Sequence, residues 1–459
     1  MKKHLLCTLG IIVFFFFTIS GFPKSESEVG IPEKYKIAAW GWLTYGRIEE
    51  SFYDRSFHQF YDYDGKSLYD LQLGYFFQRN FSERSWGKLH VNHVLVYPIQ
   101  STRDKNFKKL KKTIRTRILD ASIYLNYFKT SNISADMRIG YFSYKYNPQA
   151  MNLGEYLFRS LPYPQYLSSG FETSDKVKIP GVKFGISINE SLSQDIFIRS
   201  ETEMPPVYDF SFSYIVNYRP ISLFDISAGV DLYRIISVDE SKTSSYKDTS
   251  NFNDKAISDK IFTHYMDSTD SIPATFAGNK FMGRVSIDPK WFFSNDIWGK
   301  KDLIIYMEAL LLGTKNHPTW HTKLLRRVPV MMGVNIPTFK LLDVLSLEFE
   351  YFANPYTNSS LLIWEKRSSL PNINIGTSGE FINGYKNRNR DNWKWSLYGS
   401  RKIGKFLRFS GQIANDHSQR YTIDGLPIDD ITQVTFTKEK KIYWPFKDWY
   451  WKIRVMYYI

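Results

Sequence analysis

The last eleven residues of the chain alternate without a break between bulky apolar side chains and a wetter set that includes Lys452 and Arg454. Successive side chains of a β-strand point to opposite faces, so the pattern predicts a strand with one aromatic–aliphatic face and one cationic face. A tilted strand of about 9–11 residues is long enough to cross a bilayer. No later residue could cover the apolar face, and we expect that face to meet lipid. Its members are Trp449, Trp451, Ile453, Val455, Tyr457 and Ile459.

The same alternation recurs from about residue 35 onward, in segments separated by clusters of Gly, Pro, Asn, Asp and Ser. Sixteen such segments predict an all-β protein, and aromatic side chains such as Trp42, Tyr127, Phe128, Trp291, Trp298 and Trp449 gather near segment ends, as a membrane interface favours. The segments are Lys36–Arg47, Ser67–Arg79, Gly87–Pro98, Arg115–Phe128, Ile133–Tyr144, Lys176–Ile188, Ser193–Glu203, Asp209–Arg219, Leu223–Ile235, Asn279–Lys290, Asp302–Gly313, Arg326–Ile336, Val344–Asn354, Asn392–Ile403, Phe406–Asp416 and Asp448–Ile459.

The connections between these segments alternate in length. One set is mostly short, and the interleaved set contains every long connection: Tyr146–Asp175, Ile236–Gly278, Pro355–Asp391 and His417–Lys447. Short turns at one end and long loops at the other are typical of outer-membrane barrels, in which the turns are periplasmic. The pattern predicts a transmembrane antiparallel β-barrel of about 16 strands. A secreted β-sandwich or β-solenoid, whose strands also alternate, is the alternative.

The N-terminus reads as a secretory signal. Lys2 and Lys3 precede an apolar stretch that ends near Ile19, and a polar run follows. We therefore expect a signal peptide over residues 1–22, a short segment over 23–34, a barrel over 35–459, and placement in the cell outer membrane. The single cysteine, Cys7, lies inside the signal, so the exported chain would hold no disulfide and no thiolate metal site.

The formal net charge of +14 is compatible with nucleic acid, an anionic membrane surface or anionic solutes. Export argues against nucleic acid. Beyond the signal, the most apolar run is Leu303–Gly313, which is too short for a transmembrane helix. A closed barrel is then the way for this chain to satisfy every backbone group in lipid.

The signal, the sixteen alternating segments and the aromatic-rich final segment together resemble the Gram-negative outer-membrane porins over nearly the whole mature chain. The resemblance implies recognition of the final segment by the barrel-assembly machinery, although Ile459 stands where general porins usually finish in Phe. It also implies contact with outer-membrane lipid and lipopolysaccharide, and a third loop that folds into the lumen. The acidic Pro-Glu-Phe-Gly type signature of that loop is not found here.

The third loop, Lys145–Asp175, is the best functional candidate. Its apolar residues predict that the loop packs against other parts of the protein and is not fully solvated. It would pack either inside the lumen or outward against neighbouring loops. The stretch Asn152–Arg159 can form about two helical turns capped by Asn152. In such a helix Glu155 and Arg159 lie four residues apart and could pair.

Charged side chains on the wet faces predict the lining of a pore. Together with Glu155 and Arg159, we assign to the pore constriction or to solute contact the residues Arg138, Glu348, Glu350, Lys394, Arg408, Lys452 and Arg454. The last three segments are rich in cations, which predicts a mild preference for anions. Alternatively, the mixed charges neutralise one another in a plugged barrel.

Other polar clusters give weaker signals. The basic stretch Arg103–Arg117 fits lipopolysaccharide phosphates, anionic solutes or plain solvent. His90 and His93 fall on opposite faces of one segment and cannot share a metal, and the pair His317 and His321 is interrupted by Pro318. His93 faces lipid, as the histidine of outer-membrane phospholipases does. The acidic residues Asp424, Asp429 and Asp430 could bind calcium, but solvent fits equally well.

These features favour a non-enzymatic channel for passive diffusion of small hydrophilic solutes, without cofactor or metal. An adhesin or structural anchor that acts through the long loops is one alternative, and a barrel hydrolase is another.

Overall fold

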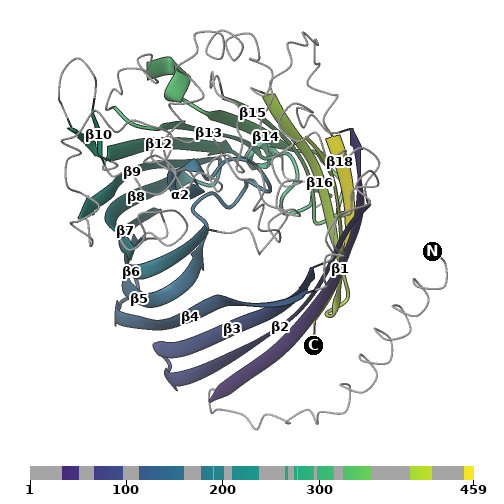
Figure 1. Cartoon of the computed structure of the whole chain (residues 1–459), viewed down its shortest axis with the longest axis horizontal. Coiled ribbons are helices and arrows are strands. Elements are labelled where there is room, and N and C mark those ends of the chain that lie inside the picture. Colours follow the sequence, from purple (N-terminus) through teal and green to yellow (C-terminus); the bar gives the residue numbers. More distant parts are fainter. Residues whose placement is uncertain are drawn as a thin grey trace.

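A computed structural model describes residues 34–50, 67–96, 113–159, 177–189, 191–200, 209–236, 264–266, 273–275, 278–293, 297–314, 324–352, 393–415 and 449–458. Sixteen antiparallel strands form one closed sheet in which the first strand is hydrogen-bonded to the last (Figure 1). Each strand otherwise pairs with its neighbours along the chain. Closure leaves no free sheet edge, which is the arrangement that a membrane requires of strands.

Each predicted segment overlaps one strand of the barrel, so the predicted fold class is confirmed. The strands are β1 (Tyr35–Glu50), β2 (Ser67–Ser82), β3 (Ser85–Val96), β4 (Thr113–Lys129), β5 (Ile133–Tyr144), β6 (Val177–Ile188), β7 (Leu192–Ser200), β8 (Phe210–Ile221), β9 (Phe224–Ile236), β12 (Gly278–Ile287), β13 (Ile305–Leu311), β14 (Val330–Asn335), β15 (Val344–Tyr351), β16 (Trp393–Ile403), β17 (Leu407–Ala414) and β18 (Trp449–Tyr458). Outside the barrel sheet lie a small hairpin, β10 (His264–Met266) with β11 (Pro273–Thr275), and the short helices α2 (Tyr156–Arg159), η4 (Pro289–Phe292) and η5 (Leu324–Arg327).

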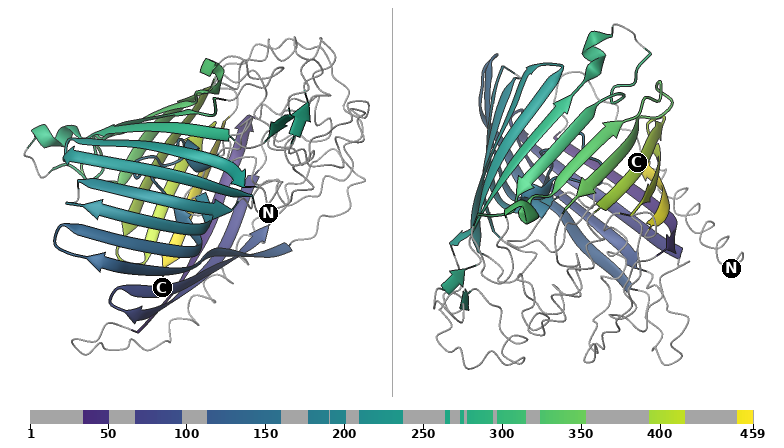
Figure 2. Two further views of the ribbon diagram at one scale, coloured as in Figure 1. Left: turned by 90° about the vertical axis from the view of Figure 1, so that its left-hand side faces the viewer. Right: turned by 90° about the horizontal axis from the view of Figure 1, so that it is seen from above.

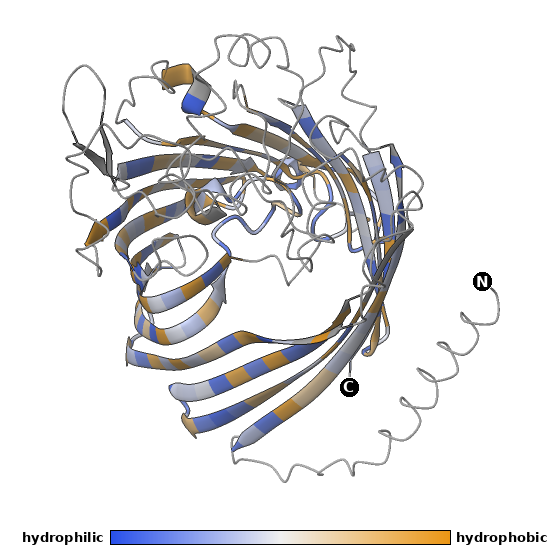
Figure 3. Cartoon of the chain, viewed as in Figure 1, coloured by the Kyte–Doolittle hydropathy of each residue, from blue (hydrophilic) through white to orange (hydrophobic). Residues whose placement is uncertain are grey.

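The outer face of the barrel is apolar and the inner face is largely polar. On β2, Leu73, Tyr75 and Phe77 are each more than 40% exposed, whereas Gln72, next to Leu73 in the sequence, is buried inside the barrel. Figure 3 shows the same alternation as orange and blue bands along the strands. The period of two therefore places one face of every strand against the surroundings and the other toward the interior.

One aromatic assignment was wrong. Trp42 was expected near a membrane interface, but it faces the interior, where it stacks on Trp40 with ring centroids 4.5 Å apart. Its neighbours across the sheet are Gln72 and Met456, which also face inward. The outward face of β1 also carries aromatic residues, Tyr35 and Tyr45, so both faces of this strand hold aromatic side chains.

The two ends of the barrel differ, as predicted. At one end the connections are 83–84, 130–132, 189–191, 222–223, 288–304, 336–343 and 404–406. At the other end all eight connections are longer than six residues, and one of them is 237–277. Figure 2 shows the tight turns that join neighbouring strands at one end of the barrel. We call the two ends the short-turn end and the long-loop end; β1 starts and β18 finishes at the short-turn end.

Several predictions lie outside the described residues. These are the signal peptide, most of the basic stretch Arg103–Arg117, the pair His317 and His321, the three acidic residues near 424–430, and Ile459. Within the described part of the chain, no helix is long and apolar enough to cross a membrane.

Candidate functional site

After β5 the chain turns into the barrel, and residues 145–159 lie against its inner wall. Figure 1 shows α2 inside the ring of strands. Tyr146, Leu153 and Leu157 are at most 4% exposed. They pack with inward-facing apolar residues of β5–β8 and β12–β14: Phe142, Ile179, Phe197, Ile215, Met282, Tyr306, Leu310 and Met331. The expected inward folding of the third loop is therefore confirmed for residues 145–159, which we call the inner loop.

Glu308, on β13, holds one part of the inner loop. Its carboxylate accepts the backbone N–H groups of Glu155 (3.0 Å) and Tyr156 (2.9 Å). It also accepts the Tyr146 hydroxyl (2.6 Å) and the Asn147 side-chain amide (2.8 Å). Burial, followed by the charge of Glu308, raises the pKa of Tyr146 well above its ordinary value, so this hydroxyl remains a donor. Hydrogen bonds to an ionised acceptor are stronger than neutral ones, which makes Glu308 a firm anchor.

Glu348, on β15, holds the preceding part of the loop. It accepts the backbone N–H groups of Met151, Asn152 (2.8 Å) and Leu153 (2.8 Å). The Tyr306 hydroxyl donates to the same carboxylate at 2.8 Å. Three consecutive N–H groups that converge on one oxyanion form a concave backbone site, here filled by a side chain of the barrel wall.

The backbone conformation between the two anchors overturns the predicted helix. Gly154 and Glu155 have φ values of +78° and +58°, in the left-handed region, and the helix runs only over Tyr156–Arg159. Asn152 does not cap it; its side-chain amide donates to Ser396 on β16 at 3.0 Å. Glu155 lies outside the helix, so the geometry assumed for its pairing with Arg159 is absent. The hydrogen bonds that Glu308 and Glu348 accept from successive backbone N–H groups outweigh the local helix propensity.

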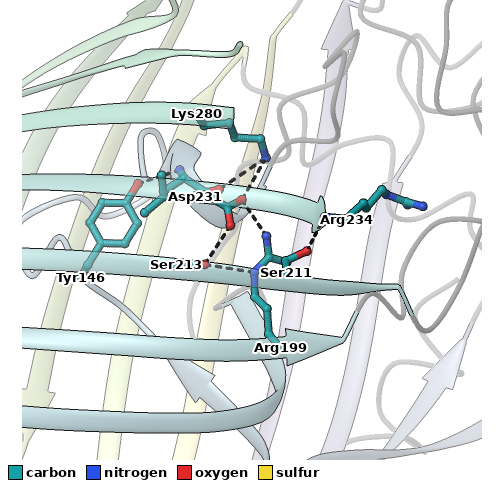
Figure 4. Close-up of polar contacts among 8 residues, drawn as sticks. Tyr146, Arg199, Ser211, Ser213, Asp231, Arg234 and Lys280 are labelled. Carbon is teal, nitrogen blue, oxygen red and sulfur yellow. Dashed lines mark hydrogen bonds and ion pairs between the residues drawn. The ribbon is translucent and has the colours of Figure 1, made fainter. Parts of the chain in front are cut away.

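Lys280, on β12, binds the inner loop from the carbonyl side. Its ammonium group lies 3.4 Å from the Leu157 carbonyl oxygen and 3.8 Å from Asp231 (Figure 4). Asp231 also accepts from Arg199 at 2.7 Å and from Ser213 at 2.8 Å. Lys280 and Asp231 are at most 2% exposed, so the charges of this cluster compensate one another away from bulk water.

Ion pairs continue around the inner wall from β3 to β12. Asp120 binds Arg138 at 2.6 Å, and Lys183 lies between Asp195 (2.8 Å) and Asp136 (3.3 Å). Cations and carboxylates therefore alternate on neighbouring strands along this arc. This arrangement fits the alternative prediction that the mixed charges neutralise one another.

The inner faces of β16–β18 carry a different charge. Their inward positions hold Lys394, Arg408, Lys452 and Arg454, and no carboxylate lies on the described inner faces of these three strands. Arg454 donates to Thr44 at 2.9 Å and stacks over Trp42 at 4.3 Å. We call this face, from β16 to β18, the cationic arc.

The contacts of the cationic arc fix its cations in place. Arg408 lies over the Tyr458 ring at 5.8 Å and Lys452 over the Tyr450 ring at 4.9 Å. Lys394 is opposite Glu350 across β15 and β16.

The structure separates the predicted site residues into three groups. Glu155, Glu348 and Glu350 belong to the contact between the inner loop and the wall, with Glu350 accepting the Tyr156 hydroxyl at 3.1 Å. Arg138 lies in the ion-pair arc, and four cations lie on the cationic arc. The side chain of Arg159 is outside the described part. Neither Lys280 nor Glu308 is among the predicted site residues. Both occupy inward positions of strongly alternating strands, which was the available signal.

Histidines of β3 have ordinary partners. His90 faces inward and accepts the Trp40 indole N–H at 2.8 Å. His93 faces outward, with Nδ1 3.0 Å from the Thr116 hydroxyl oxygen. Among the described residues, no group of three His, Cys, Asp or Glu side chains could hold a metal ion.

Comparison with known proteins gives structural similarity only. No family model and no curated protein matches the chain. A mutant porin of Rh. blastica aligns with 93% of this chain and 100% of its own length, at 6% identity and a TM-score of 0.43. OmpF of Salmonella typhi, solved in complex with daunomycin, aligns with 93% of this chain and 98% of its own, at 8% identity and a TM-score of 0.45. The closed antiparallel barrel rests on the strand pairing described above. That strand topology and the inner loop are the features from which function can be argued.

Proposed function

We propose that this porin-like barrel is an outer-membrane channel for passive diffusion of small hydrophilic solutes. One observation carries the proposal: sixteen strands close into a ring that is apolar outside and polar inside. A ring of this size has an aqueous interior unless something fills it. An apolar outer wall fits hydrocarbon, and export through an N-terminal signal would bring the chain to the outer membrane.

In this proposal the inner loop sets the size limit. It is clamped to β13 and β15 on one side of the barrel, by Glu308 and Glu348, and it reaches β16 through Asn152. Deleting Asn152–Arg159 should therefore raise the single-channel conductance in planar bilayers. Unchanged conductance would place the narrowest point elsewhere.

A mild anion preference follows from the difference between the two arcs. On the arc from β3 to β12, cations and carboxylates alternate and form ion pairs. The described inner faces of β16–β18 instead carry Lys394, Arg408, Lys452 and Arg454 and no carboxylate, and Glu350 on the adjacent β15 lies opposite Lys394. Fixed charges of one sign weight the permeation of the opposite sign.

The test is the reversal potential across a bilayer with a salt gradient. Replacing Lys394, Arg408 and Arg454 with Glu should shift it toward cation preference, and the milder pair Arg408→Gln and Lys452→Gln should shift it in the same direction if the triple variant folds poorly. Lys129→Glu, an exposed change at the end of β4, is the control. A channel that conducts with an unshifted reversal potential would refute the charge assignment, and a folded protein that does not conduct would refute the channel.

Two partners complete the proposal. The outward face of β18 would be read by the barrel-assembly machinery, and the basic stretch Arg103–Arg117 would bind lipopolysaccharide phosphates at the outer rim. The outward residues Trp449, Trp451, Ile453, Val455 and Tyr457 support the first, since they alternate with an inward cationic set.

A further inference from the structure

Bulky apolar side chains are exposed in two connections of the short-turn end that contact each other. The connection from β12 to β13 presents Trp291, Phe292, Phe293 and Ile297, each more than 50% exposed. The connection from β14 to β15 adds Phe339 (54%) and Leu341 (75%). We call these six residues the rim patch. Exposed apolar groups at this density mark an interaction surface.

The rim patch is a fixed structure. Asp302, which is 1% exposed, accepts the backbone N–H groups of Gly299 (2.8 Å) and Phe339 (3.1 Å), and thereby ties the two connections together. Trp298 stacks on Phe339 with ring centroids 5.2 Å apart. These contacts hold the two connections together at Trp298, Gly299 and Phe339.

Elsewhere at this end the exposed apolar residues, such as Phe81, Phe128 and Phe406, lie within or directly beside the strands. The connection 130–132 consists of Thr130, Ser131 and Asn132, and the connection 222–223 holds Ser222 and the buried Leu223. Figure 2 shows the β12–β13 connection projecting past the ends of the strands at the short-turn end. An aromatic girdle made by strand residues alone would not include Trp291, Phe292 and Phe293, which lie past the end of β12.

The geometry of Trp291 and Phe292 favours lipid over a rigid protein surface as the partner. Trp291 and Phe292 lie in or next to a 3₁₀ turn, in which consecutive side chains are about 120° apart. Their rings are nearly perpendicular, with centroids 5.0 Å apart. Side chains that point in such different directions cannot all rest on one rigid protein surface, whereas acyl chains can surround them.

Charge and continuity identify the lipid. Lys300 and Lys340 are exposed beside the apolar residues, where acidic headgroups would meet them. At the foot of the β12–β13 connection, Ile305 is 46% exposed on the outer wall, so the rim patch continues the apolar exterior of the barrel. Trp is enriched at the boundary between headgroups and acyl chains.

We propose that the rim patch inserts into the leaflet on the short-turn side, with its aromatic rings at the boundary of the acyl chains and Lys300 and Lys340 against acidic phospholipid headgroups. This adds a one-sided, lipid-selective anchor to the barrel. The inference rests on the proposed placement of the barrel in a membrane.

The test uses one fluorophore at a time. The chain has a single cysteine, so a Cys7→Ser background accepts unique labelling sites at Phe292→Cys, Ile123→Cys and Ser131→Cys. Each is labelled with bimane in nanodiscs that contain phosphatidylglycerol and brominated acyl chains. Ile123 reports the outer wall, where it is 55% exposed, and Ser131 reports a polar turn at the same end as the rim patch.

We expect bromolipid to quench the label at Phe292 about as strongly as at Ile123, and aqueous iodide to quench the label at Ser131. Quenching at Ile123 with a Phe292 label that behaves like Ser131 would overturn the inference and leave the channel intact. An unquenched Ile123 label would show that the barrel is not in the bilayer, and the proposed function would fail with it.

A separate experiment tests the proposed preference for acidic phospholipid headgroups. Each lysine near an acidic surface should favour the inserted state by roughly fivefold over a zwitterionic surface. Phe292 quenching should thus fall when phosphatidylcholine replaces phosphatidylglycerol, and also in the variant Lys300→Gln with Lys340→Gln. Equal quenching in the two lipids would overturn the selection of acidic headgroups.

Discussion

Glu348→Gln tests whether a carboxylate of the barrel wall holds the inner loop in place. Glu348 accepts four hydrogen bonds, three of them from consecutive backbone N–H groups of the loop. The glutamine side chain has nearly the same shape, but it lacks the negative charge. One of its two terminal atoms becomes an N–H donor that must face other donors.

The magnitude follows from these contacts. A hydrogen bond to a charged group contributes about 1.5–3 kcal/mol, and the cost of burying the carboxylate, several kcal/mol, offsets part of the sum. Glutamine keeps one acceptor, so about half of the interaction is lost. We expect the free energy of local opening of the loop to fall by about 3 kcal/mol, which corresponds to roughly a hundredfold in the opening equilibrium.

Hydrogen exchange at the backbone amides measures this quantity without any assumption about transport. Exchange at Met151, Asn152 and Leu153 should accelerate by roughly a hundredfold, because it follows the opened population. Amides of the barrel strands should keep their protection. Glu83→Gln, an exposed change in the turn between β2 and β3, is the matched control and should leave the loop unchanged. A folded Glu348→Gln barrel with ordinary exchange at these amides would refute the clamp.

Three further changes test other contacts. Gly154→Ala should lower the unfolding temperature more than Gly404→Ala. Both positions have positive φ, but an added Cβ at Gly154 would lie 2.5 Å from a neighbouring methyl carbon, whereas an added Cβ at Gly404 would have no atom within 4 Å. Equal losses of unfolding temperature would show that backbone strain alone matters. Asp231→Asn leaves two buried cations without their shared carboxylate and should cost about 3–5 kcal/mol in the free energy of unfolding, against less than about 1 kcal/mol for the exposed Asp343→Asn; similar costs would contradict the ion-pair cluster. His93→Ala should leave conductance unchanged, and neither protein should hydrolyse phospholipid; lipid hydrolysis that His93→Ala abolishes would revive the hydrolase alternative.

The strands were predictable because the two environments of a barrel wall differ so strongly. Leu73 and Gln72 are adjacent in sequence and meet opposite surroundings, so a period of two is visible without any knowledge of the partners. The same reasoning failed at Trp42, because periodicity gives the two faces of a strand but an aromatic side chain fits either of them.

The inner loop shows where local reasoning ends. Its apolar residues indicated that it packs against protein, and it does. Its backbone, in contrast, is determined by Glu308 and Glu348, which lie more than 150 residues later in the chain. No local rule for Asn152 as a helix cap could include those carboxylates. Alternation could place Lys280 on an inward face, but not its contact with the Leu157 carbonyl oxygen.

The long sequence separation between the inner loop and its two carboxylates has a consequence for assembly. Strands β5 and β6 can pair as soon as they meet, but the clamp cannot exist until β13 and β15 have joined the sheet. Until then, the apolar inner loop lacks Glu308 and Glu348, the carboxylates that hold it in the finished barrel. On the proposed function, the constriction by the inner loop is therefore complete only after β13 and β15 have joined the barrel.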